Sequence, residues 1–332
     1  MKTQIVKIAI FGFIVFLMSN KILKAQDSHM SQYDAMPVLL NPAMTGVLTQ
    51  NSIRAGAQFR SQWGALASNI TSTALVVDAP LKERWGVGGY LLNNQMSKYF
   101  NVFNFVLSGA YKITKTDQKK HLLTVGLQGG LIYKDVKDNK LVFDNQYSNG
   151  NFDPDLPSGE SFSRSSVLLP ELNYGLFYGF TDPDKKIHPY LGFSLFHITT
   201  PNESFTNSVK SRLPRKWVLH GGCNVNITDD FIIEPKGVYM RQLNVQEIEA
   251  GMNLNYNFKE SQIILMAGGF YRVKDAAIIQ IGVNYRNLVY KMSYDINTSS
   301  LKTYSEKRGG LEFSIVFNGL GDKKNKIRPM NF

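Results

Sequence analysis

The chain has 332 residues, of which 43% are hydrophobic and 19% are charged, and its formal net charge is +11. After residue 20 no stretch is long and apolar enough for a membrane helix, which excludes a helical membrane protein. The single cysteine, Cys223, excludes an internal disulfide and a thiolate metal cluster, and the scattered basic residues lack the clustered face that nucleic-acid binding needs.

The first segment, residues 1–25, has the features of a secretory signal peptide. Lys2 and Lys7 precede an apolar run from Ile8 to Met18, and Ala25 is a small residue at which a peptidase can cut. An uncleaved anchor is the alternative, because the residue three positions before the cut is unfavourable. Removal of this segment takes four lysines and no acids, so the charge falls from +11 to +7. No cysteine follows the segment, which argues against a lipid-anchored lipoprotein.

Residues 26–50 form a leader before the first predicted strand. Its Asn41-Pro42 pair is typical of a turn, and Gly46 provides a permissive backbone position. Two interpretations remain open, a simple turn leading into the first strand, which we favour, or a segment tucked under or into the mouth of the barrel predicted below.

From about residue 52 the chain alternates between apolar and polar residues in stretches of roughly ten, the length with which a tilted strand crosses a bilayer. In the first stretch Ile53, Ala55, Ala57 and Phe59 share one face, and Arg54, Gly56, Gln58 and Arg60 share the other. The pattern predicts about 14 strands, at 52–62, 70–78, 85–94, 100–113, 121–136, 166–180, 186–198, 215–227, 231–242, 246–258, 262–272, 276–286, 288–297 and 309–318.

The polar face of these stretches decides between two all-β architectures. A soluble β-sandwich usually carries many Lys and Glu on its solvent face, whereas this face is rich in Gly, Asn, Gln and Ser with occasional charges, which suits a confined, hydrated lumen. We therefore predict a transmembrane antiparallel β-barrel in the outer membrane over residues 51–318, with a soluble β protein as the alternative. Six aromatic residues lie near strand ends, where interfacial girdles occur, namely Trp63, Tyr99, Phe100, Tyr178, Trp217 and Tyr285.

Connections between the predicted strands alternate in length. Even-numbered strands are followed by short polar turns, and the longest loops, about 136–165, 199–214 and 298–308, follow odd-numbered ones. Short turns face the periplasm in this class of barrel and long loops face outward, so an even strand count predicts that both termini are periplasmic. Residues 319–332 are then a periplasmic tail.

The leader and the first strand contain a recognisable set of short motifs. Ser31, Gln32 and Tyr33 are followed by Leu40, Asn41, Pro42, Ala43 and Gly46, then by Arg60, Gln62 and Trp63, and then by Asp78 and Pro80. In their order these motifs resemble the opening signature of the PorP/SprF family of type IX secretion and gliding machinery. The specific motifs lie mainly in residues 31–95, and the tail departs from the family pattern, since Arg328-Pro329 precedes a terminal Phe332 by more than one residue.

The resemblance implies a function in protein traffic. Family members work with type IX secretion components, associate with a periplasmic lipoprotein linked to peptidoglycan, and handle a secreted cargo with a C-terminal sorting domain, which is an adhesin in gliding cells. It also makes the motif residues candidates for partner binding. We expect the long loops to meet the cargo and the 26–50 and 319–332 segments to meet periplasmic partners. The alternative function is a passive channel for small solutes, whose lumen we would expect to carry paired charges or a narrowing loop.

Catalytic and cofactor motifs are not apparent in the sequence, so we expect a protein without cofactor, metal or enzyme activity. His29 and Ser31 have the spacing of some outer-membrane phospholipases, but they lie in the leader with no strand to hold them. The oxygen-rich loop from Asp144 to Glu160 departs from the spacing of an EF-hand, and we interpret it as a solvated loop with calcium binding as the alternative.

Overall fold

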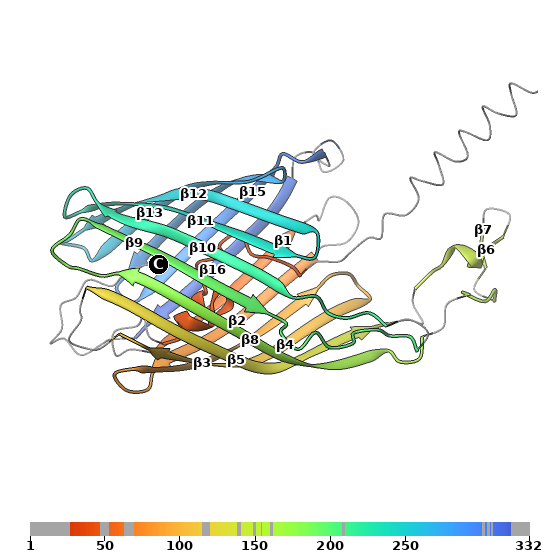
Figure 1. Cartoon of the computed structure of the whole chain (residues 1–332). Coiled ribbons are helices and arrows are strands. Elements are labelled where there is room, and N and C mark those ends of the chain that lie inside the picture. Colours follow the sequence, from red (N-terminus) through yellow and green to blue (C-terminus); the bar gives the residue numbers. More distant parts are fainter. Residues whose placement is uncertain are drawn as a thin grey trace, which may run out of the picture.

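The computed structural model describes residues 27–46, 53–62, 70–114, 120–137, 141–148, 151–153, 155–159, 162–207, 210–300, 303, 306 and 308–319. Its body is a closed antiparallel barrel of 14 strands (Figure 1). These strands are β1 (Arg54–Gln62), β2 (Ile70–Pro80), β3 (Trp85–Gln95), β4 (Phe100–Lys112), β5 (His121–Val136), β8 (Ser166–Phe180), β9 (Ile187–Phe196), β10 (Lys216–Asn226), β11 (Phe231–Gln242), β12 (Val245–Phe258), β13 (Ile263–Arg272), β14 (Ala276–Tyr285), β15 (Leu288–Asn297) and β16 (Arg308–Asn318). The predicted barrel is confirmed, and each predicted strand boundary lies within two residues of the observed one.

The barrel closes where its first strand meets its last. Gln58 of β1 lies opposite Ala74 of β2 on one side and opposite Ser314 of β16 on the other. Closure leaves no free strand edge, which a membrane requires because lipid cannot pair with backbone N–H and C=O groups.

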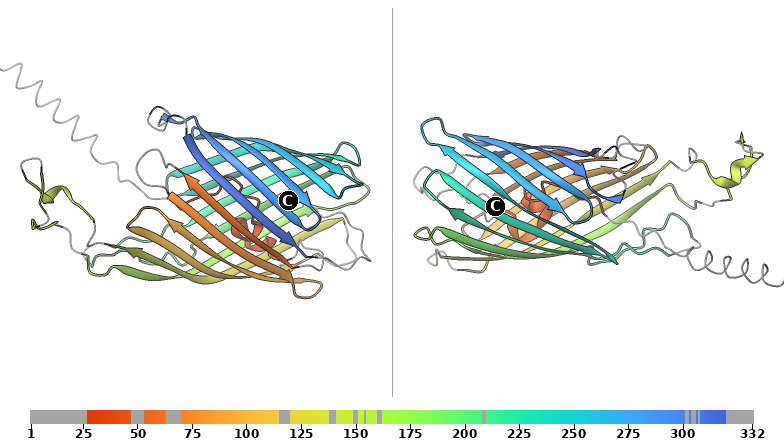
Figure 2. Two further views of the ribbon diagram at one scale, coloured as in Figure 1. Left: turned by 180° about the vertical axis from the view of Figure 1, so that it is seen from behind. Right: turned by 90° about the horizontal axis from the view of Figure 1, so that it is seen from above.

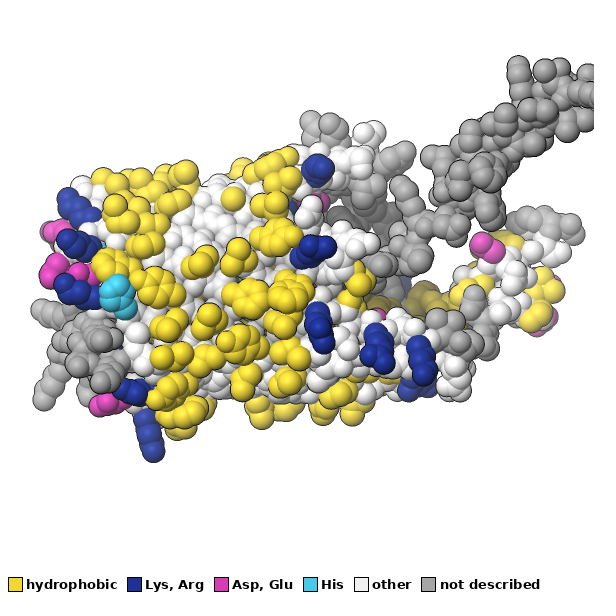
Figure 3. All heavy atoms as spheres, viewed as in Figure 1, with side chains coloured by type: hydrophobic (Ala, Val, Ile, Leu, Met, Phe, Trp, Pro, Cys, Tyr) yellow, Lys and Arg dark blue, Asp and Glu magenta, His cyan; other side chains and the backbone are white. Residues whose placement is uncertain are grey.

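Side chains alternate between an apolar outer wall and a polar lumen, as the sequence pattern predicts. In β12, Glu249 and Asn253 face inward and are 1% and 3% exposed, whereas Met252 is 49% exposed on the outside. Figure 3 shows the resulting belt of hydrophobic side chains across the middle of the visible face of the barrel. No helix in the described part of the chain is long and apolar enough to cross a membrane.

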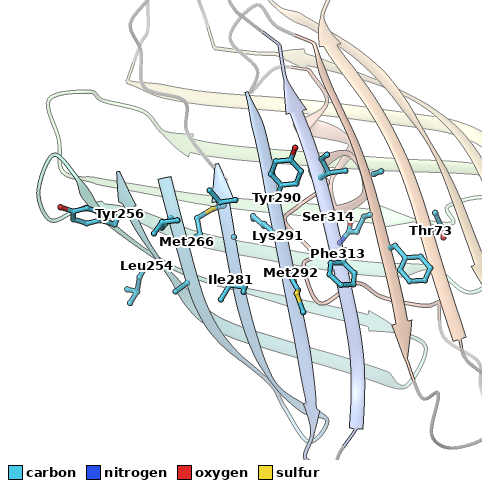
Figure 4. A pocket seen from close by; sticks show the side chains of 18 of the residues that line it. Thr73, Leu254, Tyr256, Met266, Ile281, Tyr290, Lys291, Met292, Phe313 and Ser314 are labelled. Carbon is cyan, nitrogen blue, oxygen red and sulfur yellow. The ribbon is translucent and has the colours of Figure 1, made fainter. Parts of the chain in front are cut away.

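The outer wall is hollowed on the side formed by β12 to β16 and β1 (Figure 4). Outward-facing side chains such as Tyr290, Met292 and Phe313 line this recess, whose volume is about 880 Å³. It belongs to the lipid-facing surface.

The two ends of the barrel differ in their connections. One end, called here the loop end, carries the connections after β1, β3, β5, β9 and β15, and the opposite turn end carries short turns such as those after β2 and β8. Between β5 and β8 the loop contains a small hairpin of β6 (Tyr147–Ser148) and β7 (Asn151–Phe152), which was not predicted and which projects away from the loop end (Figures 1 and 2).

The leader lies inside the barrel. Its described residues, 27–46, contain one short α-helix, α2 (Pro37–Leu40), and one 3-10 turn, η1 (Pro42–Met44), and both are enclosed by the strands in all views (Figures 1 and 2). Residues 27–30 and Leu39 are partly buried. Every other residue from Ser31 to Gly46 is buried. The leader is therefore the central core of the barrel.

Candidate functional site

The leader crosses the lumen from one end of the barrel to the other. At the loop end, the Asp27 amide donates to Gln242 Oε1 at 2.8 Å, and Gln242 is the last residue of β11. At the turn end, the Gly46 amide donates to Asp78 Oδ2 at 2.6 Å, near the end of β2. Residues 27–46 are thus a plug that spans the lumen.

This path disagrees with the predicted sidedness of the leader. Gly319 donates to Ile53 O at 2.7 Å at the turn end, so the described C-terminal end lies opposite Asp27. Asp27 and Gly319 therefore lie at opposite ends of the barrel, so the expectation that residues 26–50 and 319–332 lie together on the periplasmic side does not hold for both segments. That the turn end faces the periplasm stays a prediction.

Ser31 and Gln32 hold the leader through their backbone. Both amides donate to the carboxylate of Glu312, at 2.8 Å from Ser31 and 2.9 Å from Gln32. Gln58 donates to the same carboxylate at 2.6 Å and to the Gln32 carbonyl at 3.1 Å. Ser314 donates to Gln32 Oε1 at 2.6 Å. A buried carboxylate with several amide donors is a strong anchor, because hydrogen bonds to a charged acceptor are stronger than neutral ones.

A cluster of buried charges surrounds the Ser31 side chain. Arg60 pairs with Asp295 at 2.8 Å and with Glu312 at 2.9 Å. Arg272 pairs with Asp295 at 3.1 Å and with Glu249 at 2.9 Å. The Ser31 hydroxyl donates to Asp295 and accepts from both guanidinium groups. The hydroxyl is thus part of a structural ion-pair network, with Ser31 fixed rather than in a flexible leader.

The lumen contains more paired charge than the sequence pattern suggested. Arg60, Arg272, Asp295 and Glu312 are each buried within strands and have opposite charges within 3.1 Å. A buried charge without a partner would destabilise the fold strongly, because it loses its hydration. Ion pairing and hydrogen bonds offset this desolvation cost. The lumen does contain the expected Asn, Gln and Ser side chains, but the occasional charges of the sequence pattern are joined in buried ion pairs, which was not predicted.

Tyr33 and Asp34 anchor the next part of the leader. Tyr33 packs with Leu40 and with inward side chains of β9 to β11. Asp34 accepts from Lys236 at 2.6 Å and from Lys291 at 3.4 Å. Asp34 is therefore a buried counterion for two lumen lysines.

The Leu40–Ala43 motif is a folded unit fixed to the wall. Asn41 accepts from the Ala43 amide at 2.9 Å, which caps η1, and its side-chain amide donates to Leu176 O at 3.0 Å. Pro42 begins η1, where a missing N–H costs nothing. Ser194 of β9 donates to Leu40 O at 2.9 Å.

Two glycines of the wall allow this motif to approach closely. A Cβ at Gly126 of β5 would lie 2.2 Å from the Pro42 carbonyl carbon, and one at Gly175 of β8 would lie 2.1 Å from Asn41 Oδ1. Any side chain at either position would push the motif away from the wall. The interpretation of the motif as a simple turn leading into the first strand is therefore wrong, and the alternative, a segment tucked into the barrel, agrees with the structure.

Gly46 ends the plug at the turn end. Its φ of +62° lies in the left-handed region, and an added Cβ would lie 2.3 Å from Ala79 O. Asp78, which accepts from Gly46, also accepts from Arg54 at 2.7 Å. Glycine is thus required here by both backbone conformation and space.

At the loop end, His197 holds the first described residue of the leader. His197 Nε2 lies 2.7 Å from Asp27 Oδ2, and His197 Nδ1 lies 2.9 Å from Glu171 Oε2. Burial disfavours the charged imidazole, but the two carboxylates outweigh it and raise the pKa of His197 to about 9. We call this Asp27–His197–Glu171 contact the latch. It was not predicted, because nothing local in the sequence links these residues.

Most of the motif residues meet in the lumen. Ser31, Gln32, Tyr33, Leu40, Asn41, Pro42, Gly46 and Arg60 all contact either the leader or the wall that holds it. Gln62 accepts from Arg60 at 3.1 Å and so supports it indirectly. Trp63 lies outside the described residues. Whether any motif residue also binds a partner stays a prediction.

The residues considered above for enzyme activity and calcium binding make ordinary structural contacts. His29 pairs with Glu247 at 2.9 Å. In the described part of the 144–160 loop, Asn145 donates to Ser158 O at 3.3 Å. Among the described residues, no group of His, Cys, Asp and Glu has an arrangement that could hold a metal ion.

A closed barrel with an apolar belt, a polar lumen and a leader as its plug defines the class of an outer-membrane β-barrel. The chain belongs to the family of type IX secretion system membrane proteins PorP/SprF, whose model matches residues 22–317. It is thus an outer-membrane component of the type IX secretion system, and its family implies interaction with other components of that system. No curated protein matches the chain.

Several solved structures are similar to the barrel at low identity. The toluene transporter TbuX of Ralstonia pickettii is 10% identical with a TM-score of 0.47, and the match covers 85% of this chain and 92% of that one. The toluene transporter TodX of P. putida is 9% identical with a TM-score of 0.46, and the match covers 87% and 92%. The NanC porin is 11% identical with a TM-score of 0.39, and the match covers 81% and 99%. Similarity this low says nothing about what this chain carries.

Proposed function

We propose that the protein is a non-enzymatic component of the secretion system that binds a secreted or surface protein with a C-terminal sorting domain, which would be an adhesin in a gliding cell. We further propose that it binds periplasmic partners linked to the cell wall. Family membership supports the role in secretion. The leader inside the lumen supports a protein-binding function over conduction of solutes.

The main observation behind this proposal is that the leader fills the lumen. The leader is covalently part of the chain and is held at the Glu312 carboxylate, at Lys236 and at the wall strand β9. A solute could pass only if these buried contacts were broken, and breaking a buried ion pair typically costs about 3–5 kcal/mol. A protein that works through its end surfaces does not need an open lumen.

The two ends are suited to different partners. The loop end carries the long connections and the β6–β7 hairpin, which extend beyond the barrel (Figure 1). We assign cargo binding to this end. The turn end and the 319–332 tail are assigned to periplasmic partners, whereas residues 27–46 are occupied with contacts inside the barrel.

A passive channel is the second candidate function. Paired charges and a narrowing segment are the features that we expected of a channel, and the lumen has both. However, the charged groups of the wall are engaged by the leader through Ser31 and Asp34. We therefore attribute these charged groups to holding the plug in the lumen.

The test is co-purification from outer membranes in mild detergent without crosslinker, followed by mass spectrometry. The affinity tag is placed in the short turn at 259–262, so that the hairpin and the tail stay free. We expect the wild type to recover a sorting-domain protein and a peptidoglycan-linked lipoprotein.

Two matched variants separate the ends. Replacing residues 142–162 by a short Gly-Ser linker should remove the cargo and retain the lipoprotein, and truncation after Gly319 should do the reverse. A partner-free wild-type barrel that conducts ions would refute the proposal in favour of the channel. Loss of both partners in both variants, with the barrel still folded, would refute the assignment of partners to separate ends.

A further inference from the structure

A second recess lies on the outer wall at the loop end, over β9, β10 and β11. Its volume is about 950 Å³. Its lining includes Phe193, Arg212, Arg215, Trp217, Leu219 and Arg241. It combines a hydrophobic floor with three arginine side chains, whereas the recess of Figure 4 is lined by one lysine and no arginine.

The floor consists of outward-facing aromatic and aliphatic side chains. Trp217 and Leu219 of β10 are each 45% exposed on the outer wall. Phe193 of β9 lies beside Trp217, with ring centroids 5.8 Å apart. Such a surface at the edge of the apolar belt suits acyl chains, and Trp is enriched at the level of lipid headgroups.

Three arginines, Arg212, Arg215 and Arg241, lie above this floor and are exposed. Arg241 lies directly opposite Trp217 in the strand register, and Arg215 is two residues before Trp217 on the same face of the chain. Diagonal neighbours of this kind are roughly 7–8 Å apart, within reach of long side chains. Arg215 and Arg241 are therefore close enough to contact one ligand, and Arg212 lines the same recess.

None of these three arginines forms an ion pair with a carboxylate of the described residues. Within the described part of the chain, the Arg241 side chain donates to the Leu243 carbonyl alone, at 3.3 Å. The buried Arg60 and Arg272, in contrast, each have at least two carboxylate partners. Figure 3 shows a row of Lys and Arg side chains at the end of the apolar belt that is nearer the hairpin. The positive charge at this boundary is thus available to an anion.

We propose that the recess binds the phosphorylated headgroup of an outer-leaflet glycolipid, the lipid A part of lipopolysaccharide, with its acyl chains on the Trp217 floor. Guanidinium groups bind phosphate through paired N–H donors, and basic pockets at a membrane boundary recognise anionic lipid headgroups. The choice of lipid A follows from the loop end, which faces outward in this class of barrel. The proposal rests on the outward orientation of the loop end and does not require that cargo binds there.

The test measures lipid binding by native mass spectrometry of the full-length barrel in detergent. The probes are diphosphorylated lipid A, its dephosphorylated form and phosphatidylglycerol. We expect the wild type to retain the diphosphorylated form. The triple variant Arg212→Gln, Arg215→Gln, Arg241→Gln should bind it at least about tenfold more weakly, because it loses the charge-assisted contacts to the phosphates.

Two further variants keep the result interpretable. A matched control with Lys82→Gln, Lys185→Gln and Arg286→Gln removes the same charge at the turn end and should bind lipid A as the wild type does. A variant with lysine in place of the three recess arginines should bind lipid A more strongly than the triple glutamine variant does. This partial recovery would show that the loss in the glutamine variant is due to charge and not to misfolding.

Three outcomes would overturn the proposal. Equal loss of binding in the recess variant and the turn-end control would show a general charge effect. Equal binding of dephosphorylated lipid A would remove the role of the arginines. Binding of phosphatidylglycerol as strong as that of lipid A would show that the occupant is a common phospholipid.

Discussion

The substitution Glu312→Gln should loosen the plug while leaving the barrel wall intact. Donors from Ser31, Gln32, Gln58 and Arg60 converge on this carboxylate, at distances of 2.6 to 2.9 Å. Glutamine replaces one oxygen by an NH2 group, so that about two of these donors lose their acceptor. At roughly 1.5–3 kcal/mol for each hydrogen bond to a charged group, the loss is about 3–6 kcal/mol.

This loss is large enough to measure. A change of about 3 kcal/mol shifts the ratio of docked to released leader by roughly 100-fold. We expect planar bilayers with the wild type to show almost no conductance, and those with Glu312→Gln to show frequent openings. A fluorophore on Ser28→Cys, in a Cys223→Ser background, should also become more mobile in the variant.

The control is Glu306→Gln, which removes a carboxylate from an exposed ion pair with Arg308 at the loop end. It should leave both conductance and fluorophore mobility unchanged. If Glu312→Gln folds, as judged by heat-modifiable migration on gels, and behaves like the wild type in both assays, Glu312 does not retain the leader and the reasoning is refuted.

Three further predictions concern the ends and the middle of the plug. Because the pKa of His197 is raised to about 9 from an ordinary value near 6.5, the latch to Asp27 is fully stabilising below about pH 6.5 and is lost as the pH rises through about 9. Anisotropy of a fluorophore at Ser28 should fall over this range, and His197→Gln should abolish the transition. Asp34→Ala should destabilise the barrel by about 3–5 kcal/mol by leaving Lys236 buried without its nearest counterion, and the added change Lys236→Met should recover much of this in thermal unfolding. In intact cells, a membrane-impermeant label should react with Ser28→Cys if the loop end faces outward, and protection of that thiol would place the loop end in the periplasm.

The strands could be predicted from the sequence because each residue of a strand faces one of two environments. Phe59 faces lipid and its neighbours Gln58 and Arg60 face the lumen, so local alternation contains the information needed. The length of the connections likewise separates the two ends. Neither inference requires knowledge of contacts between distant residues.

The path of the leader could not be predicted in this way. Its contacts join residues far apart in the chain, with 281 positions between Ser31 and Glu312 and 202 between Asp34 and Lys236. The turn chemistry of Asn41-Pro42 fits an exposed turn as well as a buried one. One signal was present, since Arg60, Lys236 and Glu312 occupy inward positions in strands, where a charge requires a partner. Alternation places such charges in the lumen but does not show what pairs with them.

The leader also bears on how the barrel closes. The Ser31 and Gln32 amides donate to Glu312 of β16, the Gln32 side chain accepts from Ser314 of β16, and the Gln32 carbonyl accepts from Gln58 of β1. The leader thus bridges the seam where the first and last strands meet. Removing the leader would leave the seam carboxylate Glu312 buried without two of its donors. The leader therefore stabilises the closed barrel as well as filling it, and a partner that opened the lumen would need to compensate the charges of the seam. Closure and occlusion are in this way two consequences of the same buried contacts.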